Sequence, residues 1–100
     1  MRIIKVKPLI DFYQKHSSAE QPLKAWVKEA KKAQWQSPHD IKSMYRSADI
    51  LQGNRVVFNI GGNKYRLIVQ INYFCGVVYI KFIGTHTDYD RIKAEKIDAY

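Results

Sequence analysis

The stretch covering residues 56–84 constrains the fold of this chain most strongly. It reads VVFNIGGNKYRLIVQINYFCGVVYIKFIG, which is three runs rich in β-branched and aromatic residues. A Gly61-Gly62 pair follows the first run, and the second turn centres on Phe74 and Cys75. Such runs favour strands, and glycine adopts the positive φ angles that tight hairpin turns need. We therefore predict three antiparallel strands joined by two hairpins.

The predicted pairing also assigns the side chains to two faces. A two-residue turn at Gly61-Gly62 places Ile60 opposite Asn63 and Val57 opposite Arg66. Because side chains alternate along a strand, the pairing predicts an apolar core face and a mixed face. The core face is expected to carry Val56, Phe58, Ile60, Tyr65, Leu67, Val69, Ile71, Val78, Ile80 and Phe82. The mixed face is expected to carry Arg55, Val57, Asn59, Lys64, Arg66, Ile68, Gln70, Tyr79, Lys81 and Ile83.

The part of the chain before these strands has mainly helical periodicity. Residues 2–6 are β-prone and predict a short strand that joins the sheet, and residues 8–16 predict a short amphipathic helix. Ser17 and Ser18 are N-cap candidates for a second helix, with Glu20 or Gln21 completing a capping box. Its apolar stripe is Leu23, Trp26, Val27, Ala30 and Ala33, whereas Trp35, near the helix end, suits either a core or a surface position.

The remaining segments complete the predicted order of elements. Residues 39–46 predict one or two further helical turns, and residues 47–54 predict a polar connection. After the strands, Thr85 or Thr87 is expected to cap a final helix that continues through Ile97. We predict an α+β fold with N-terminal helices on one face of a small antiparallel sheet and a short C-terminal helix. Residues 1–100 are expected to form one domain.

Charge is the strongest signal in the composition. The chain has 17 basic and 9 acidic residues, a net charge of +8 and a pI near 9.7. This excess favours an anionic partner such as nucleic acid, an acidic protein or a membrane surface. No signal peptide is recognised, and no apolar run approaches the roughly 20 residues that cross a bilayer, so we expect a cytoplasmic protein without a membrane partner.

The metal-binding residue types are few and scattered. Cys75 is the only cysteine, which excludes an internal disulfide and a cysteine-based metal cluster. His16 and His39 are isolated in the sequence, and nothing nearby completes a metal site around either. We therefore predict neither a metal ion nor a cofactor.

Arg66 is the leading candidate for function because it lies mid-strand on the face opposite the core. Its guanidinium group can hold a phosphate through two hydrogen bonds. A structural salt bridge is the alternative, but Asp and Glu are absent from residues 51–87. The same face is expected to carry Asn59, Lys64, Tyr79 and Lys81. Cations for phosphates, with amides and an aromatic ring for bases, are what a single RNA strand requires.

His86 is the second candidate because it directly follows the last strand. Asp88, Tyr89 and Asp90 come within one helical turn of it. A histidine titrates near neutral pH, so it can accept or donate a proton during a reaction. The alternative is a histidine that only belongs to the loop or caps the helix.

Two of these segments carry a family resemblance. FNIGGNKYR, which ends at Arg66, and the later GTHTDYD, which contains His86, resemble the HigB family of type II toxin–antitoxin toxins, a group of RelE-like mRNA interferases. The resemblance implies a RelE-like fold and a small endoribonuclease that cleaves mRNA, often on translating ribosomes. It also implies neutralisation by a HigA-like helix-turn-helix antitoxin in a hetero-oligomeric complex.

The resemblance also implies roles for single residues. Arg66 matches the arginine of the penultimate strand that contacts the scissile phosphate. His86 matches a basic or histidine position after the last strand, and Tyr89 matches the tyrosine of the closing helix. RelE-like toxins place lysines on the strand before the arginine, where this chain has Val57 and Asn59.

The expected reaction is attack of an RNA 2′-hydroxyl on the adjacent phosphate without a metal ion. Lys64 or Lys81 would hold the RNA backbone, and Tyr79 would stack on a base. Two other functions stay open from the sequence. One is a non-catalytic basic RNA-binding module, and the other is an interaction domain whose basic face binds an acidic partner.

Overall fold

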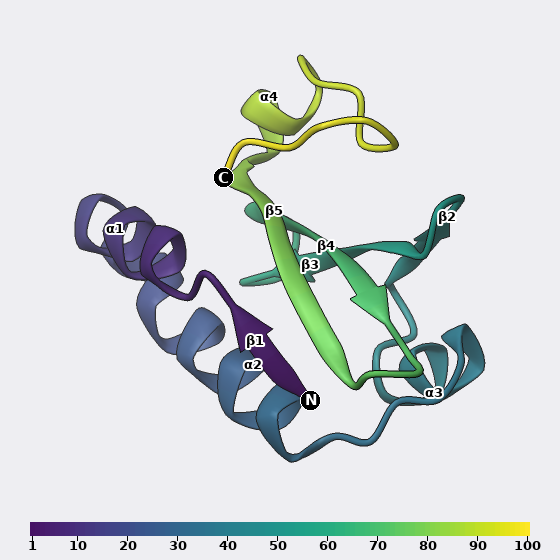
Figure 1. The fold of residues 1–100 in the computed structure, drawn as a ribbon. Coiled ribbons are helices and arrows are strands. Elements are labelled where there is room, and N and C mark those ends of the chain that lie inside the picture. Colours follow the sequence, from purple (N-terminus) through teal and green to yellow (C-terminus); the bar gives the residue numbers. More distant parts are fainter.

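The computed structural model describes residues 1–100, and five strands in it form one sheet in the order β1-β5-β4-β3-β2 (Figure 1). The elements are β1 (Arg2–Ile4), α1 (Lys7–Lys15), a 3₁₀ turn (Ser17–Ala19), α2 (Glu20–Lys32), α3 (Pro38–Met44), β2 (Asp49–Leu51), β3 (Arg55–Ile60), β4 (Tyr65–Asn72), β5 (Val77–Thr85) and α4 (His86–Tyr89). This arrangement confirms the predicted α+β, RelE-like fold. The sheet is mixed because β1 runs parallel to β5 while the other neighbouring strands are antiparallel. No helix has both the length and the apolar character needed to cross a membrane.

Helices α1, α2 and α3 cover one face of the sheet and enclose the main core with it. The predicted apolar stripe of α2 is confirmed by its buried residues, among them Trp26. At the centre of the core lies Phe58, which is 1% exposed. Its ring centroid lies 5.3 Å from that of Trp26, 6.1 Å from Trp35 and 5.1 Å from Tyr45. Both tryptophans are therefore core residues, as expected of the larger aromatic side chains in a small domain.

The start of α2 lacks the capping box that the sequence predicted. No side chain caps the first turn of α2, which follows directly from the 3₁₀ turn. The backbone N–H of Ala19 donates to the carbonyl of His16 at 2.9 Å, so the chain is already helical when α2 begins. Ser18 instead shares a hydrogen bond with the Tyr65 hydroxyl on the sheet.

The register of the first hairpin also differs from the prediction. Ile60 pairs with Tyr65 and Asn59 pairs with Arg66, so the loop contains the four residues 61–64. Gly61 and Gly62 adopt φ angles of 63° and 71°, which explains why glycines occupy this turn. The register is displaced by two residues from the predicted one, and a displacement by two leaves every side chain on its predicted face.

The second hairpin is centred as predicted, but a β-bulge changes the far half of β5. Asn72 pairs with Val77, which confirms the turn centred on Phe74 and Cys75. Farther along, Val69 pairs with Ile80 whereas Ile68 pairs with Phe82. The extra residue reverses the alternation, so Ile83 joins the helix-covered core and Phe82 joins the other face. The predicted faces of Phe82 and Ile83 are therefore wrong.

Two further elements differ from the prediction. The predicted polar connection contains β2, which pairs antiparallel with β3 through Asp49 and Val57. The predicted final helix is only four residues long, although Thr85 caps it in a capping box with Asp88. Residues 90–100, called here the C-terminal segment, continue without regular structure beyond α4 (yellow in Figure 1). The backbone N–H of Ala99 donates to the carbonyl of Lys81, so this segment returns to the sheet.

The C-terminal segment covers the middle of the face that faces away from α1 and α2. Its residue Ala94 forms a second small core with Val57, Ile68 and Phe82. Arg55 is only 8% exposed on the same face, and its Nη1 donates to the carbonyls of Ala94 at 3.1 Å and Ile97 at 2.6 Å. The mixed face is thus not an open basic surface. Only its ends remain accessible, and one of these ends carries Arg66.

Candidate active site

Arg66 lies on β4, between Asn59 of β3 and Gly84 of β5. Its Nη1 donates to the carbonyl of Asn63 at 3.1 Å and to that of Tyr65 at 3.2 Å. Arg66 belongs to none of the ion pairs of the structure. A guanidinium group has five N–H donors, so Arg66 keeps its charge and several donors for a ligand.

Gly84 shapes the surface directly beside Arg66. A Cβ atom at this position would lie 2.5 Å from Cζ of Phe82 and 3.1 Å from Cβ of Asp88. The missing side chain lets the Phe82 ring lie against the backbone and lets α4 close over the end of β5. Glycine is therefore required here for space and not for an unusual φ angle.

Helix α4 brings Tyr89 to Arg66. The backbone N–H of His86 donates to the carbonyl of Lys64 at 3.0 Å, which ties the start of α4 to the β3–β4 loop. Cζ of Arg66 lies 5.9 Å from the centroid of the Tyr89 ring, within the range of a cation–π interaction. The structure therefore brings together two residues that are far apart in the sequence and were both predicted to belong to the site.

Burial shifts the titration of Tyr89. Partial burial raises the pKa of its hydroxyl above the ordinary value, the charge of Asp49 adds to this shift, and the charge of Arg66 opposes it. The hydroxyl therefore stays protonated at neutral pH. In that state it can donate a proton to a reacting group, but it cannot act as a base.

His86 is exposed at the start of α4 and pairs with the carboxylate of Asp90. The distance between Nδ1 of His86 and Oδ2 of Asp90 is 3.1 Å. A carboxylate only accepts hydrogen bonds, so this contact places a proton on Nδ1 and leaves Nε2 of the neutral ring as the acceptor. Such a pairing orients the ring and selects the tautomer that can act as a base.

Asn59 and Lys64 complete this end of the sheet. Nδ2 of Asn59 donates to the carbonyl of Ser47 at 3.3 Å, which leaves the amide oxygen available. Lys64 is exposed in the β3–β4 loop and takes part in no ion pair. The set of Asn59, Lys64, Arg66, His86 and Tyr89 is called here the Arg66 site.

Tyr79 and Lys81 lie elsewhere on the sheet. Tyr79 pairs with Gln70, four residues beyond Arg66 along β4, which corresponds to about 13 Å at the usual strand rise. Nζ of Lys81 lies 3.3 Å from the Asp98 carboxylate and 5.8 Å from the Tyr79 ring centroid. The second small core lies between them and Arg66, so the structure does not bring Tyr79 and Lys81 together with Arg66, and their role in RNA binding stays a prediction.

The sequence reasoning missed two acidic residues near the Arg66 site. Asp49 lies on the unpredicted strand β2, on the same face as Val57, and its charge acts on Tyr89. Asp90 was noted as a neighbour of His86 but not as its partner. The run Asp-Ile-Leu-Gln-Gly-Asn, residues 49–54, contains the hairpin signal that could have revealed β2.

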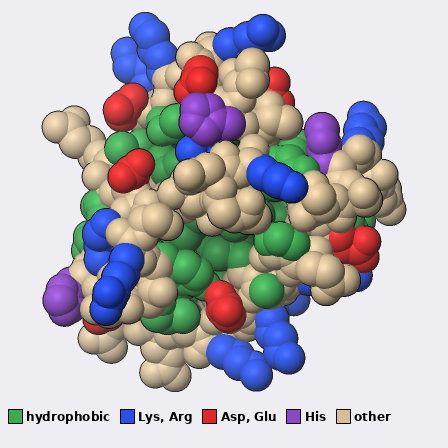
Figure 2. All heavy atoms as spheres, turned by 180° about the vertical axis from the view of Figure 1, so that it is seen from behind, with side chains coloured by type: hydrophobic (Ala, Val, Ile, Leu, Met, Phe, Trp, Pro, Cys, Tyr) green, Lys and Arg blue, Asp and Glu red, His purple; other side chains and the backbone are tan.

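Charge alone does not locate the site. Figure 2 shows Lys and Arg side chains spread around the edge of one face of the molecule, with acidic side chains among them and apolar ones in the middle. The net charge of +8 is therefore not gathered into one patch on this face. What distinguishes the Arg66 site is its set of groups: an arginine without an acidic partner, a protonated phenol and an oriented imidazole.

We expect the Tyr89 hydroxyl to ionise above pH 10, because burial and the charge of Asp49 disfavour the phenolate. The phenolate absorbance of the wild-type chain minus that of a Tyr89→Phe variant isolates this group from the other tyrosines. A difference signal whose midpoint lies at or below the ordinary pKa of tyrosine would contradict the described environment of Tyr89.

Comparisons with known proteins show that the chain is similar to HigB toxins. A family model described as HigB_toxin, RelE-like toxic component of a toxin-antitoxin system, matches residues 19–92. The chain is 28% identical over 96 residues to the mRNA interferase toxin HigB of Escherichia coli strain K12, covering 94% of this chain and 92% of that protein. The identity and the coverage are the same for the mRNA interferase HigB of Shigella flexneri. Another mRNA interferase HigB, from Escherichia coli O6:H1, is 23% identical over 94 residues, covering 92% and 91% of the two chains.

Proposed function

The chain belongs to the HigB family of RelE-like toxins of toxin–antitoxin systems, and from this membership we propose that it is an endoribonuclease that cleaves mRNA. The names of its relatives support this activity. We further propose that residues 1–100 act as one toxin domain in the bacterial cytoplasm. There the toxin inhibits translation and growth until a HigA-like antitoxin neutralises it.

The environment of Arg66 is the observation that carries the proposal. Its guanidinium group keeps a full positive charge without an acidic partner, on a sheet face where the other arginine, Arg55, is buried by backbone carbonyls. A cation with free N–H donors at the rim of an accessible site suits a phosphate oxygen. Asn59 and Lys64 lie beside it and add an amide and a second cation for the RNA strand.

The proposed reaction is attack of an RNA 2′-hydroxyl on the adjacent phosphorus. A new bond forms between the 2′-oxygen and phosphorus, and the bond from phosphorus to the 5′-oxygen of the next nucleotide breaks. Nε2 of His86 accepts the proton of the 2′-hydroxyl, and the Tyr89 hydroxyl donates a proton to the departing 5′-oxygen. Arg66 stabilises the charge that develops on the phosphate oxygens.

The proposed mechanism needs no lysine on β3, where RelE-like toxins place lysines and this chain has Val57 and Asn59. Val57 is buried in the second small core, and the Asn59 amide cannot act as a base. His86, held by Asp90, supplies the acceptor instead. His86 is exposed and Tyr89 is only partly buried, so we propose that the ribosome positions the mRNA and that proximity supplies much of the rate.

Tyr79 and Lys81 are proposed as more distant RNA contacts. They lie on the far side of the second small core from Arg66, where Tyr79 is 40% exposed. Lys81 is paired with Asp98, so its contribution to RNA binding is expected to be smaller than that of Lys64. A base stacked on Tyr79 would belong to a nucleotide away from the cleaved bond.

The direct test is induction of the gene in a bacterium followed by mapping of mRNA 5′ ends. We expect growth arrest together with new 5′ ends inside coding regions that are absent without induction. Growth arrest without new 5′ ends would instead support a non-catalytic RNA-binding module. Normal growth and an unchanged set of mRNA ends would contradict both functions.

A further inference from the structure

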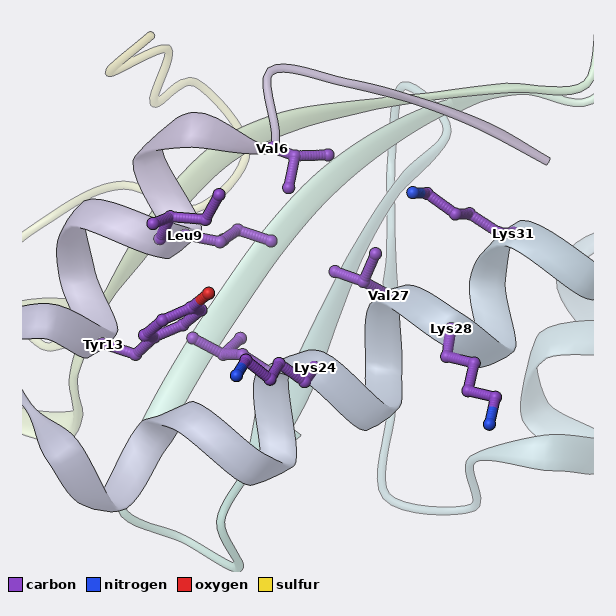
Figure 3. A pocket seen from close by; sticks show the side chains of 9 residues that line it. Val6, Leu9, Tyr13, Lys24, Val27, Lys28 and Lys31 are labelled. Carbon is purple, nitrogen blue, oxygen red and sulfur yellow. The ribbon is translucent and has the colours of Figure 1, made fainter.

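A mainly apolar groove lies between α1 and α2, on the other side of the sheet from the Arg66 site. It has a volume of about 330 Å³. Its lining residues are Val6, Leu9, Ile10, Tyr13, Leu23, Lys24, Val27, Lys28 and Lys31. Figure 3 shows Leu9 and Tyr13 on the α1 side facing Val27 on the α2 side, with the lysine side chains extending from α2.

The groove combines an apolar floor with a basic rim. Leu9 and Leu23 are buried at its base, whereas Ile10 is 36% exposed in its wall. An isoleucine that remains this exposed beside other apolar side chains forms an accessible apolar surface. The groove therefore has the character of an unfilled helix–helix contact.

The lysines of the rim differ in their partners. Nζ of Lys24 lies 2.6 Å from the Glu20 carboxylate and 5.6 Å from the Tyr13 ring centroid, so it is held within α2 and over the groove. Lys28 and Lys31 are exposed and take part in no ion pair. They leave two uncompensated positive charges on the α2 side of the groove.

We propose that this groove binds an amphipathic helix of the antitoxin, with apolar side chains on one stripe and Asp or Glu beside them. The inference rests on the proposed function in that a toxin requires a neutralising partner. A helix laid into a groove between two helices buries its apolar residues in the manner of other helix-in-groove complexes. Its acidic side chains then meet Lys28 and Lys31.

The chemistry of the groove favours a protein helix over RNA. The lining contains no amide side chain and only one aromatic ring, which is already covered by Lys24. RNA bases need aromatic side chains to stack on and groups that form hydrogen bonds. The Arg66 site provides more hydrogen-bonding groups than the groove does. An apolar floor with cations on its border instead matches the pattern of an acidic amphipathic helix.

The groove and the Arg66 site lie on opposite sides of the sheet. α1 and α2 pack on the face that carries Phe58 and Leu67. Arg66 belongs to the opposite face, because it alternates with Leu67 along β4. Substitutions at the rim of the groove should therefore leave the catalytic geometry unchanged, so that antitoxin binding and RNA cleavage can be tested separately.

The test is a charge reversal at the rim, Lys28→Glu with Lys31→Glu, compared with Lys15→Glu with Lys32→Glu. Both double variants change the net charge equally on exposed positions of α1 or α2, and neither Lys15 nor Lys32 lines the groove. Without antitoxin we expect both variants to inhibit growth like the wild-type toxin. With the antitoxin from the adjacent reading frame, the control is expected to be neutralised and the rim variant to stay toxic.

Affinity for the purified antitoxin provides a readout that does not depend on RNA cleavage. Measured by calorimetry in an Arg66→Ala background, the rim variant should bind at least tenfold more weakly than the control. Equal affinity of the two double variants would overturn the inference, and so would a rim variant that loses RNA binding but keeps antitoxin binding. A third variant, Ile10→Ser, should weaken binding through the apolar wall without a change of charge.

Discussion

An Arg66→Ala variant is expected to lose RNA cleavage and growth inhibition while keeping its fold. The arginine has no ion pair to lose, and its two hydrogen bonds go to the carbonyls of Asn63 in the β3–β4 loop and of Tyr65 at the start of β4. What disappears is the charge that we propose stabilises the transition state. Loss of one such electrostatic group lowers a cleavage rate by about 10²–10³-fold in comparable sites. Growth curves after induction and single-turnover cleavage of RNA measure both effects.

Two further variants sharpen the test. Arg66→Lys keeps the charge but not the planar fork of donors, so we expect its cleavage rate to lie between those of the wild type and Arg66→Ala. Arg91→Ala removes an exposed arginine just after α4 and should cleave RNA normally. Thermal unfolding followed by circular dichroism establishes that each variant is folded. A folded Arg66→Ala protein that is as toxic as the wild type would remove Arg66 from the site.

An Arg55→Met variant is expected to lower the free energy of unfolding by about 2–6 kcal/mol, since each of the two carbonyls that lose their donor costs about 1–3 kcal/mol. Arg55 holds the C-terminal segment through the carbonyls of Ala94 and Ile97. Its loss should loosen that segment and expose Val57, Ile68 and Phe82 to water. Urea denaturation measures the change.

The same variant should also cleave RNA more slowly. Tyr89 packs against the second small core, so a loosened C-terminal segment no longer holds the phenol beside Arg66. Arg46→Met is the matched control, because Arg46 is exposed and its side chain makes no hydrogen bond or ion pair. An unfolding free energy equal to that of this control would show that the buried guanidinium does not hold the C-terminal segment.

The two proposed functions, antitoxin binding and RNA cleavage, thus lie on opposite faces of the sheet. The face with α1 and α2 encloses the main core and presents the groove proposed for the antitoxin. The opposite face is partly filled by the C-terminal segment, which leaves the Arg66 site open at one end. Because the same segment follows α4 directly, the stability of the second core and the position of Tyr89 depend on one another.

Several features could be predicted from the sequence because they depend on local patterns. Alternation of apolar and polar residues assigned the faces of β3 and β4, and the four-residue loop did not disturb them, since a register displaced by two residues keeps the alternation. The helical stripe of α2 and the Thr85 cap likewise rest on residues a few positions apart. Arg66 could be singled out because it was assigned to the face opposite the core and no acidic residue in 51–87 could pair with it, although it is the second residue of β4 and does not lie mid-strand as predicted.

Other features could not be predicted because contacts between distant residues decide them. The bulge in β5 turns Phe82 onto the face where Gly84 leaves it space, and it turns Ile83 into the core. The pattern of apolar and polar residues along β5 does not show where an extra residue is inserted, because the bulge is defined by the pairing with β4. The composition of residues 47–54 likewise suggested a polar loop, and only pairing with β3 makes three of these residues a strand.

By itself, the sequence determined the α+β class, the faces of β3 and β4, the family and the choice of Arg66, His86 and Tyr89. These follow from periodicity and from a motif whose residues lie close together in the chain. Only the tertiary structure decided that Tyr89 meets Arg66, that Asp90 orients His86, and that Arg55 is a structural anchor. The physical reason is that a buried guanidinium and an accessible one look identical in sequence. Which carbonyls or open surface surround each one depends on how the C-terminal segment packs across the sheet.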